Sequence, residues 1–225
     1  MIEGPASAEA HVFVTDLDQP ELDPRDRHHL ERVLRLRPGA IVTLSDGAGR
    51  WRVARFGLAV EPDGPIELVP APEPLITIAF ALVKAERPEL AVQKLTELGV
   101  DRIVLYVADR SVVRWDDERA EHHMERLRRV AREASMQSRR VRLPGVVWSA
   151  TFAAVAEAPG AALAERDGAP VDLMHTTVLV GPEGGWSPRE LDQGLPRVVL
   201  GPHVLRAETA AITAGALLVA ARMRR

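Results

Sequence analysis

The sequence predicts an α/β protein in two parts, a small β-barrel over residues 1–72 and a larger α/β domain over residues 73–225. The apolar segments up to about residue 70 are short, rich in β-forming residues and separated by turn residues. Pro70, Pro72 and Pro74 then form a stiff, extended connector. Beyond it, strand-like and helix-like segments alternate, which is typical of a mostly parallel sheet covered by helices.

The first part is expected to contain short strands and one helix. The strand segments lie at residues 11–14, 40–47, 51–60 and 65–69. Between the first two, residues 25–36 place Leu30, Val33 and Leu34 at helical spacing, with arginines around them. Short strands joined by turn residues favour a small barrel.

The second part alternates between the two patterns until the chain ends. Strands are expected at residues 75–83, 102–108, 145–148, 160–165, 176–181 and 197–201. Helices are expected at residues 86–100, along a face formed by Met124, Leu127, Ala131, Ala134 and Ser138, and at residues 207–223. Because the last helix is rich in alanine and contains Gly215, we expect it to pack very closely on the sheet or on a second copy of the chain.

Composition excludes several classes of protein. The 225 residues are 46% hydrophobic, which is enough for a sizeable core. The absence of cysteine excludes disulfides, Cys-ligated zinc, iron–sulfur clusters and thiol nucleophiles. No secretory signal is visible, and the longest apolar stretch, residues 210–221, is shorter than a membrane span, so we expect a cytoplasmic protein. No metal is expected, because the adjacent pairs His28/His29 and His122/His123 face different ways on a helix.

The net charge of -3 says little about partners, but the distribution of arginine says more. One glutamate and seven arginines give residues 126–142 a local charge of +6. We call these seven the arginine stripe: Arg126, Arg128, Arg129, Arg132, Arg139, Arg140 and Arg142. Further arginines cluster in residues 25–37 and 50–55. This distribution favours RNA or another polyanion, and the alternative is an arginine-rich solvated surface.

The segment VLVGPEGGWSPRE, residues 178–190, has the pattern of a strand that ends in a ligand-binding loop. Pro182 pushes Gly181 toward an extended conformation and ends the strand. Gly184 and Gly185 lack a Cβ, so the backbone can approach a ligand closely. The alternative is a tight strand-to-helix turn with no ligand. The glycine spacing matches neither a dinucleotide fingerprint nor a P-loop.

A short capped helix is expected directly after this loop. Ser187, Pro188 and Glu190 fit an N-cap, a first-turn proline and the reciprocal glutamate of a capping box. A strand, a glycine loop and a capped helix form a binding crevice at the carboxyl edge of an open α/β sheet.

A second strand exit resembles the first. In the segment VVLGPHVLRAETA an apolar strand ends at Gly201 and Pro202. Arg206 and Glu208 follow, just before the alanine-rich final helix. If the two strands are adjacent, their Gly-Pro exits place two loops side by side. Core packing explains the alanines, but it does not explain a loop that carries Arg206 and Glu208.

Four ordered segments resemble the RsmE family of SPOUT-superfamily methyltransferases, which methylate N3 of a uridine in bacterial 16S ribosomal RNA. They are GPEGGWS, LGPHVLRAETA, KAERPELAVQKLTELGV and REASMQSRR followed by Pro144. HHLERVLRLRPG and LSDGAGRW also resemble that family's PUA-like barrel. The resemblance implies a SPOUT-type α/β trefoil-knot methyltransferase domain preceded by a small PUA-like β-barrel that binds RNA.

The resemblance further implies the cofactor S-adenosylmethionine (S-adenosyl-L-methionine), held by loop backbone. The matching cofactor-binding residues are Leu179, Gly181, Pro182, Glu183, Gly184, Gly185, Leu200, Gly201, Val204, Leu205, Arg206, Glu208, Thr209 and Ala210. A homodimer is also implied, with the final helix and the knot at its interface and the active site completed by the partner. The expected substrate is 16S rRNA, in the assembled small ribosomal subunit.

The residue types at these positions suit the reaction. N3 of uracil must lose its proton before or as it attacks the methyl group, and a guanidinium stabilises the charge that develops on the flanking carbonyls. Arg206 is the first candidate for that role and Arg139 the second. Glu183 and Glu208 are both candidates for the base, and the alternative for each is to bind backbone amides.

Expected RNA contacts come from both parts of the chain. They are Arg25, Arg27, Arg32, Arg35, Lys84, Arg87, Lys94, Arg132, Gln137, Arg139 and Arg140. For Lys84 and Arg87 the alternative is a surface ion pair with Glu86 or Glu89. Two rival functions stay open at this point: another SPOUT enzyme that methylates tRNA or a ribose 2′-hydroxyl, and an RNA-binding ribosome assembly factor without catalysis.

Overall fold

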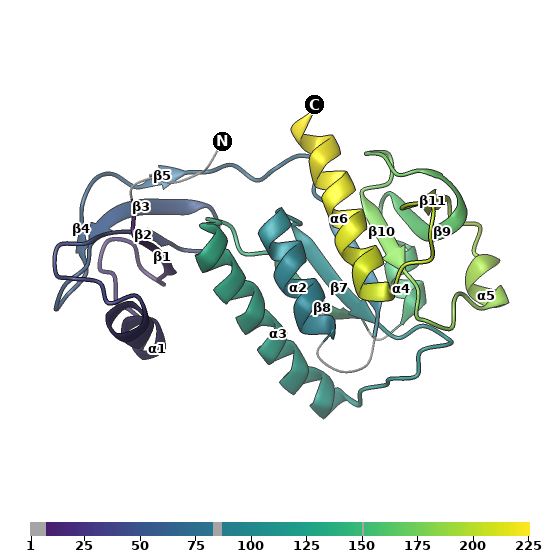
Figure 1. Cartoon of the computed structure of the whole chain (residues 1–225), viewed down its shortest axis with the longest axis horizontal. Helices are drawn as coiled ribbons and strands as arrows, with labels where there is room; N and C mark the ends of the chain where they lie inside the picture. Colours follow the sequence, from purple (N-terminus) through teal and green to yellow (C-terminus); the bar gives the residue numbers. More distant parts are fainter. Residues whose placement is uncertain (1–7, 83–86, 150) are drawn as a thin grey trace. The chain divides into compact units, whose positions relative to one another are not determined.

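A computed structural model describes residues 8–82, 87–149 and 151–225, and its contacts divide the chain into two compact units (Figure 1). The first unit contains the chain up to Ala71 and, in addition, Arg132–Leu143. The second unit contains Pro72–Ala131 and Pro144–Arg225. The predicted division at residue 72 did not include the segment that returns to the first unit.

The first unit is built on a five-stranded sheet. Its strands are β1 (Ala10–Phe13), β2 (Ile41–Ser45), β3 (Arg50–Arg55), β4 (Glu61–Pro62) and β5 (Glu67–Leu68). β1 pairs with β2 in parallel, whereas β3 pairs antiparallel with β2, β4 and β5. Val12, Val42 and Leu44 point into an apolar core and are fully buried. β4, which is two residues long and exposed, was not predicted.

The predicted single helix over residues 25–36 is wrong in part. α1 (Pro24–His28) continues as η1 (His29–Val33), a π-helix, which leaves Leu30 buried but Val33 and Leu34 exposed. A π turn contains more residues than an α turn, so the side chains after Leu30 are no longer on the same face. Helical spacing alone therefore overestimated the buried face.

The end of α3 (Asp117–Ser138) and the segment after it belong to the first unit. The hydroxyl of Ser45 donates to the carbonyl of Val141 at 2.7 Å. Arg139 has a φ of 57°, and its N–H and that of Arg140 bond back to the carbonyls of Met136 and Ser135. This is the Schellman pattern, in which the residue in the left-handed conformation is usually glycine.

The second unit is a six-stranded parallel sheet covered by helices, as the alternating pattern predicted. The strands, in the order β11-β9-β10-β6-β7-β8 across the sheet, are Arg197–Val199, Ala161–Pro170, Thr177–Val180, Thr77–Ala81, Arg102–Tyr106 and Gly145–Ser149. The helices, besides the first part of α3, are α2 (Arg87–Leu98), α4 (Phe152–Ala156), α5 (Pro188–Leu191) and α6 (Ala207–Met223). Of these, α4 was not predicted from the sequence. Among the described residues no helix has the length and apolar character needed to cross a membrane.

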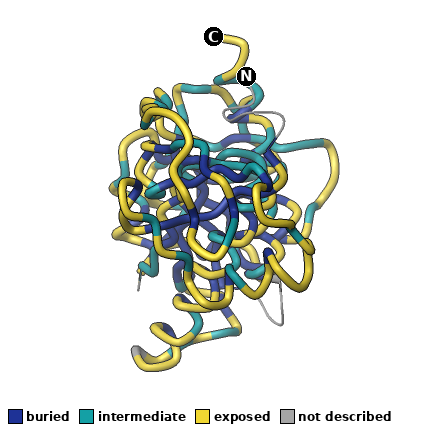
Figure 2. Tube along the Cα trace, turned by 90° about the vertical axis from the view of Figure 1, so that its left-hand side faces the viewer, coloured by how far each residue is buried: buried dark blue, intermediate teal, exposed yellow. Residues whose placement is uncertain are grey.

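The sheet buries side chains on both faces. On β6, Ile78 and Phe80 pack on one side with α2, α3 and α6, whereas Ala79 and Ala81 pack on the other side with α4 and Trp186. α2 and α6 lie side by side (Figure 1), and Figure 2 shows the buried residues concentrated in the interior. A Cβ on Gly215 of α6 would lie 2.6 Å from the side chain of Leu95. The final helix therefore packs closely on its own unit.

The two strands with Gly-Pro exits are not adjacent. β9 lies between β10 and β11, so the expectation of neighbouring strands is wrong. The register between β9 and β11 also shifts within the pair. Arg197 is opposite Leu163, whereas the next residue, Val198, is opposite Ala169. Residues 164–168 therefore form a bulge on β9, next to the carboxyl ends of β10 and β11.

Candidate active site

A cavity of about 460 Å³ lies in the second unit at the carboxyl ends of β10 and β11. Its walls come from the loop after β10, the segment between β11 and α6, and the bulge of β9. Ten predicted cofactor-binding residues line it: Gly181, Pro182, Glu183, Gly185, Leu200, Gly201, Val204, Leu205, Arg206 and Ala210. Its volume is in the range of small-molecule sites.

Four residues of the predicted cofactor set do not line the cavity. Leu179 is fully buried in β10 and packs against the core on the opposite side. Gly184 turns its carbonyl toward Arg110, which donates to it at 3.1 Å. Glu208 is buried in the first turn of α6, and Thr209 is exposed on that helix. For Leu179, Glu208 and Thr209 this follows from strand alternation and helix periodicity, which direct neighbouring side chains to different sides.

Other lining residues were not predicted. They are Ala164, Glu165, Arg166, Val180, Trp186, Val199, His203 and Ala207. Trp186 and His203 stand inside the two motifs, so the motifs themselves contained the signal. Nothing local in the sequence marks the β9 bulge, because its approach to the cavity depends on a shift in strand pairing.

Trp186 forms a rigid part of the cavity wall. Its indole N–H donates to the carbonyl of Ala164 in the β9 bulge at 3.3 Å. The ring also makes an edge contact with Phe152, with centroids 5.7 Å apart. A Cβ on Gly181 would lie 3.1 Å from the indole, so the absence of a side chain there allows the ring to cover the backbone. The glycine thus serves the packing of the loop.

The capping box predicted for α5 is confirmed. The N–H of Ser187 donates to Glu190 Oε2 at 2.8 Å, and the N–H of Glu190 donates to Ser187 Oγ at 3.2 Å. Pro188 occupies the first turn of α5, and the side chain of Glu190 is buried. The capping box therefore fixes the position at which the cavity-lining loop ends and α5 begins.

Both charge types required by the expected chemistry occur at the cavity. Arg206 is the exposed N-cap residue of α6, where the positive end of the helix dipole faces the cavity. Glu183 is exposed in the loop after β10. Arg139, the second catalytic candidate, belongs to the first unit and does not line the cavity of the second.

Among the predicted RNA-binding residues, eight belong to the first unit: Arg25, Arg27, Arg32, Arg35, Arg132, Gln137, Arg139 and Arg140. Arg25 and Arg32 are exposed on α1 and η1, and Arg35 is exposed with a φ of 55°. Arg27 donates to the carbonyl of Gly57 at 3.1 Å and contacts Glu31. Gln137 is exposed near the end of α3.

The remaining predicted RNA contacts belong to the second unit. Lys94 on α2 forms an ion pair with Glu97 at 2.8 Å. Lys84 lies outside the described residues, and so does the side chain of Arg87.

The arginine stripe is not uniformly solvated. Arg132 donates to both carboxylate oxygens of Asp26 and to the carbonyl of Phe13, and the hydrogen bond with Asp26 raises the pKa of Arg132. Arg142 donates to the carbonyl of Val69 at 3.0 Å. Arg126 and Arg128 also have acidic partners within the protein. The stripe therefore holds the fold together as well as presenting positive charge.

No three His, Asp, Glu or Cys side chains gather as metal ligands in the described ranges. The residues that line the cavity supply backbone amides, apolar surface and charged side chains instead.

The chain matches known RNA methyltransferases in sequence and in fold. Residues 71–219 match the RNA methyltransferase domain family, and residues 22–57 match the RNA methyltransferase PUA domain family. Ribosomal RNA small subunit methyltransferase E of Mycobacterium bovis is 36% identical over 219 residues, covering 86% of this chain and 83% of the relative. The Synechocystis protein of the same name is 30% identical over 209 residues, covering 81% of this chain and 67% of the relative.

Solved structures give the same picture. Ribosomal RNA small subunit methyltransferase E of Neisseria gonorrhoeae, bound to S-adenosyl methionine, has a TM-score of 0.79 at 29% identity, covering 92% of this chain and 95% of that one. A Legionella pneumophila methyltransferase in complex with bound SAM has a TM-score of 0.81 at 30% identity, covering 94% of this chain and 97% of that one.

The fold, the cavity and these matches define an RNA methyltransferase that carries a PUA domain. The chain belongs to the ribosomal RNA small subunit methyltransferase E family, the RsmE family that its motifs resemble. The expected α/β fold with a parallel sheet and a PUA-like domain is confirmed, and the trefoil knot stays a prediction.

Proposed function

We propose that this protein transfers a methyl group from S-adenosylmethionine to N3 of a uridine in 16S ribosomal RNA. The observation that carries the proposal is the cavity of the second unit, where the two motif loops, one after β10 and one after β11, meet with Arg206 and Glu183 at one site. Membership of the small subunit methyltransferase E family supports the choice of substrate. The rival functions require either a different RNA target or a cavity without catalytic use.

The cavity suits S-adenosylmethionine in size and in chemistry. Trp186, Leu200 and Leu205 offer apolar surface to an adenine ring, and the backbone around Gly181 and Gly201 offers amide donors and carbonyl acceptors. Charged side chains at the cavity are available for the amino acid end of the cofactor. When bound, S-adenosylmethionine supplies an electrophilic methyl group on a sulfonium centre.

The protein's own residues would prepare the uracil for attack. Arg206, exposed at the cavity, stabilises the negative charge that develops on the uracil carbonyls as N3 loses its proton. Glu183, which also lines the cavity, is better placed than the buried Glu208 to accept that proton. Glu208 then contributes through the first turn of α6, where a negative charge is favourable.

The first unit would grip the RNA. Exposed arginines on α1 and η1 offer contacts to phosphates, and the match to a PUA domain of RNA methyltransferases supports this role. Arg139 and Arg140 belong to the same unit because α3 ends there. Since small-subunit rRNA is made and assembled in the cytoplasm, we place the protein there.

We further propose that the protein works as a homodimer through α6. Leu217 and Met223 are apolar residues exposed on this helix, 38% and 80% respectively. Exposed apolar side chains on a helix are a common subunit contact. Light scattering at several protein concentrations tests the proposal, which predicts twice the mass of the 24.6 kDa chain.

The proposed reaction is tested by methyl transfer to defined RNA substrates. Purified protein is incubated with labelled S-adenosylmethionine and with either small ribosomal subunits or free 16S rRNA, both from a strain that lacks the modification. The proposal predicts label in the RNA, and more of it with assembled subunits. Absence of label from both substrates, with cofactor binding demonstrated, would contradict it.

A further inference from the structure

The end of β7 and the loop after it form hydrogen bonds with the glycine loop of the cavity. We use this name for the segment after β10 that contains Gly181, Gly184 and Gly185. Tyr106, the last residue of β7, donates its hydroxyl hydrogen to the carbonyl of Val180 at 2.9 Å. Val180 is the last residue of β10 and lines the cavity. Two further links, from Asp109 and Arg110, follow along the same loop.

Asp109 is tied to the capping box at the far end of the glycine loop. Its carboxylate accepts a hydrogen bond from the hydroxyl of Ser187 at 2.6 Å, and its N–H donates to Glu190 Oε1 at 2.9 Å. Glu190 therefore receives one N–H from Ser187 on one oxygen and one from Asp109 on the other. Because this carboxylate is buried, its two hydrogen bonds hold the two loops in a fixed relation.

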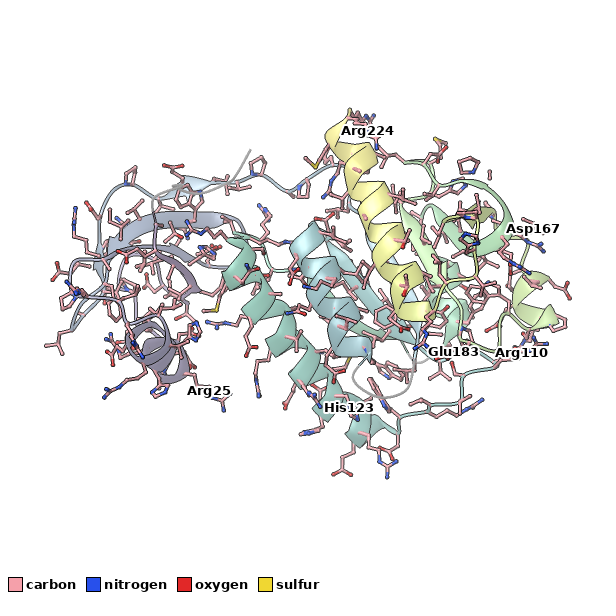
Figure 3. All side chains as sticks on the ribbon, in the orientation of Figure 1. Arg25, Arg110, His123, Asp167, Glu183 and Arg224 are labelled. Atoms are coloured by element: carbon pink, nitrogen blue, oxygen red, sulfur yellow. The ribbon has the colours of Figure 1, made fainter. Side chains whose placement is uncertain are left out.

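Arg110 contacts the middle of the glycine loop. Its guanidinium donates to the carbonyl of Gly184 at 3.1 Å, and a Cβ on Gly184 would lie 3.2 Å from Arg110 Cβ. In Figure 3 Arg110 and Glu183 lie near one another at the same end of the sheet. Gly185, with a φ of 69°, closes the turn through a hydrogen bond from its N–H to the carbonyl of Pro182.

Neither Asp109 nor Arg110 lines the cavity, but Gly185 and Trp186 do, and these two residues lie between the contact of Arg110 at Gly184 and that of Asp109 at Ser187. Gly181, Pro182 and Glu183 lie between the link at Val180 and the link at Gly184, and they form one wall. A glycine-rich segment has many backbone conformations when it is not held, so its shape depends on these contacts.

We propose that Arg110 and Asp109 are positioning residues that set the affinity for S-adenosylmethionine by holding the glycine loop in its binding conformation. This inference rests on the proposed function, because it takes the cavity as the cofactor site. Releasing either contact lets the loop sample conformations that do not bind, and the apparent affinity falls by the fraction lost.

The test compares Arg110→Ala and Asp109→Ala with the conservative variants Arg110→Lys and Asp109→Asn. Lysine still offers one donor to the Gly184 carbonyl, and asparagine still offers an oxygen to the Ser187 hydroxyl. Arg119→Ala is the matched control, because Arg119 lies outside the arginine stripe and makes an exposed ion pair with Asp116 at 3.5 Å at the start of α3. For each full-length variant, cofactor binding is titrated by calorimetry, KM and kcat are measured for both substrates, and thermal unfolding is recorded.

We expect each alanine variant to raise the dissociation constant and the KM for S-adenosylmethionine about three- to tenfold, the effect of one ordinary hydrogen bond. The kcat, the KM for RNA and the melting temperature should stay close to wild type, and the conservative variants should recover most of the affinity. Unchanged affinity in both alanine variants overturns the inference. A lower melting temperature and a lower kcat, with an unchanged KM for S-adenosylmethionine, would also overturn it, because a merely structural role gives that result. If the wild-type protein itself does not bind the cofactor, the proposed function fails first.

Discussion

The indole of Trp186 lies against the backbone of Gly181, so closely that a Cβ on the glycine would be 3.1 Å from the ring. Both residues line the cavity, and Trp186 also links the glycine loop to the β9 bulge through the carbonyl of Ala164. This wall of the candidate active site is therefore a packed arrangement of two segments, the glycine loop and the β9 bulge.

Gly181→Ala should displace the indole and disturb this wall. We expect a loss of stability of about 1–3 kcal/mol, as for other overpacked sites, together with weaker cofactor binding. Calorimetric titration and tryptophan fluorescence measure the two effects. Gly145→Ala is the control, because its nearest neighbour would be 3.8 Å away. Wild-type affinity in Gly181→Ala would show that the contact does not shape the site.

Arg206→Ala should nearly abolish turnover while leaving the proposed dimer intact. Removing a donor that stabilises developing negative charge typically lowers kcat about 100- to 1000-fold, and cofactor binding should change far less. Single-turnover assays with small ribosomal subunits measure the effect. Arg224→Ala, an exposed residue at the other end of α6, is the control. Turnover near wild type in Arg206→Ala would refute the catalytic assignment.

Arg222→Ala should destabilise the second unit without touching the cavity. Arg222 donates to Asp101 at 2.5 Å and to the carbonyls of Pro74 and Gly99, and both partners of the ion pair are largely buried. Removing the guanidinium takes its positive charge away from the largely buried carboxylate of Asp101. We therefore expect the free energy of unfolding, measured by urea denaturation, to fall by about 2–4 kcal/mol. A variant as stable as wild type would mean that water replaces the guanidinium without loss.

Acid should destabilise the first unit through His11. Burial lowers the pKa of His11 from its ordinary value of 6.5 to about 4, and the positive charges of Arg139 and Arg132 act in the same direction. Above pH 6.5 the ring is neutral in both states, so it does not alter stability. As the pH falls toward 4, the unfolded chain binds a proton that the folded chain does not, and stability falls by up to about 3 kcal/mol.

The measurement for His11 is the free energy of unfolding between pH 7 and pH 4, for wild type and for His11→Asn. We expect a shallower dependence on pH in the variant, because asparagine does not titrate. Parallel curves would show that His11 is not the group responsible.

Much of the fold could be predicted because its signals are local. The alternation of strands and helices after residue 75, the apolar face of α3 and the capping box of Ser187 and Glu190 each depend on neighbouring residues. The return of Arg132–Leu143 to the first unit could not be predicted in this way. It depends on contacts such as that between Ser45 and Val141, which are distant in sequence.

The site divides along the same line. Ten of the predicted cofactor residues line the cavity because two motifs carry them, whereas Glu165 and Arg166 enter it through a shift in strand pairing. The roles of the arginines in the stripe could not be predicted from the sequence. Counting charges does not distinguish Arg132, which is held by Asp26, from an arginine that is available to RNA.

The most direct test of the account identifies the methylated nucleoside. Small ribosomal subunits from a strain lacking the modification are labelled by the purified protein and S-adenosylmethionine, and the rRNA is digested and separated by chromatography with mass detection. The account predicts that the label is in 3-methyluridine and that Arg206→Ala slows its appearance about 100- to 1000-fold. Label in a ribose 2′-O-methyl nucleoside or in any other base would contradict the proposed reaction.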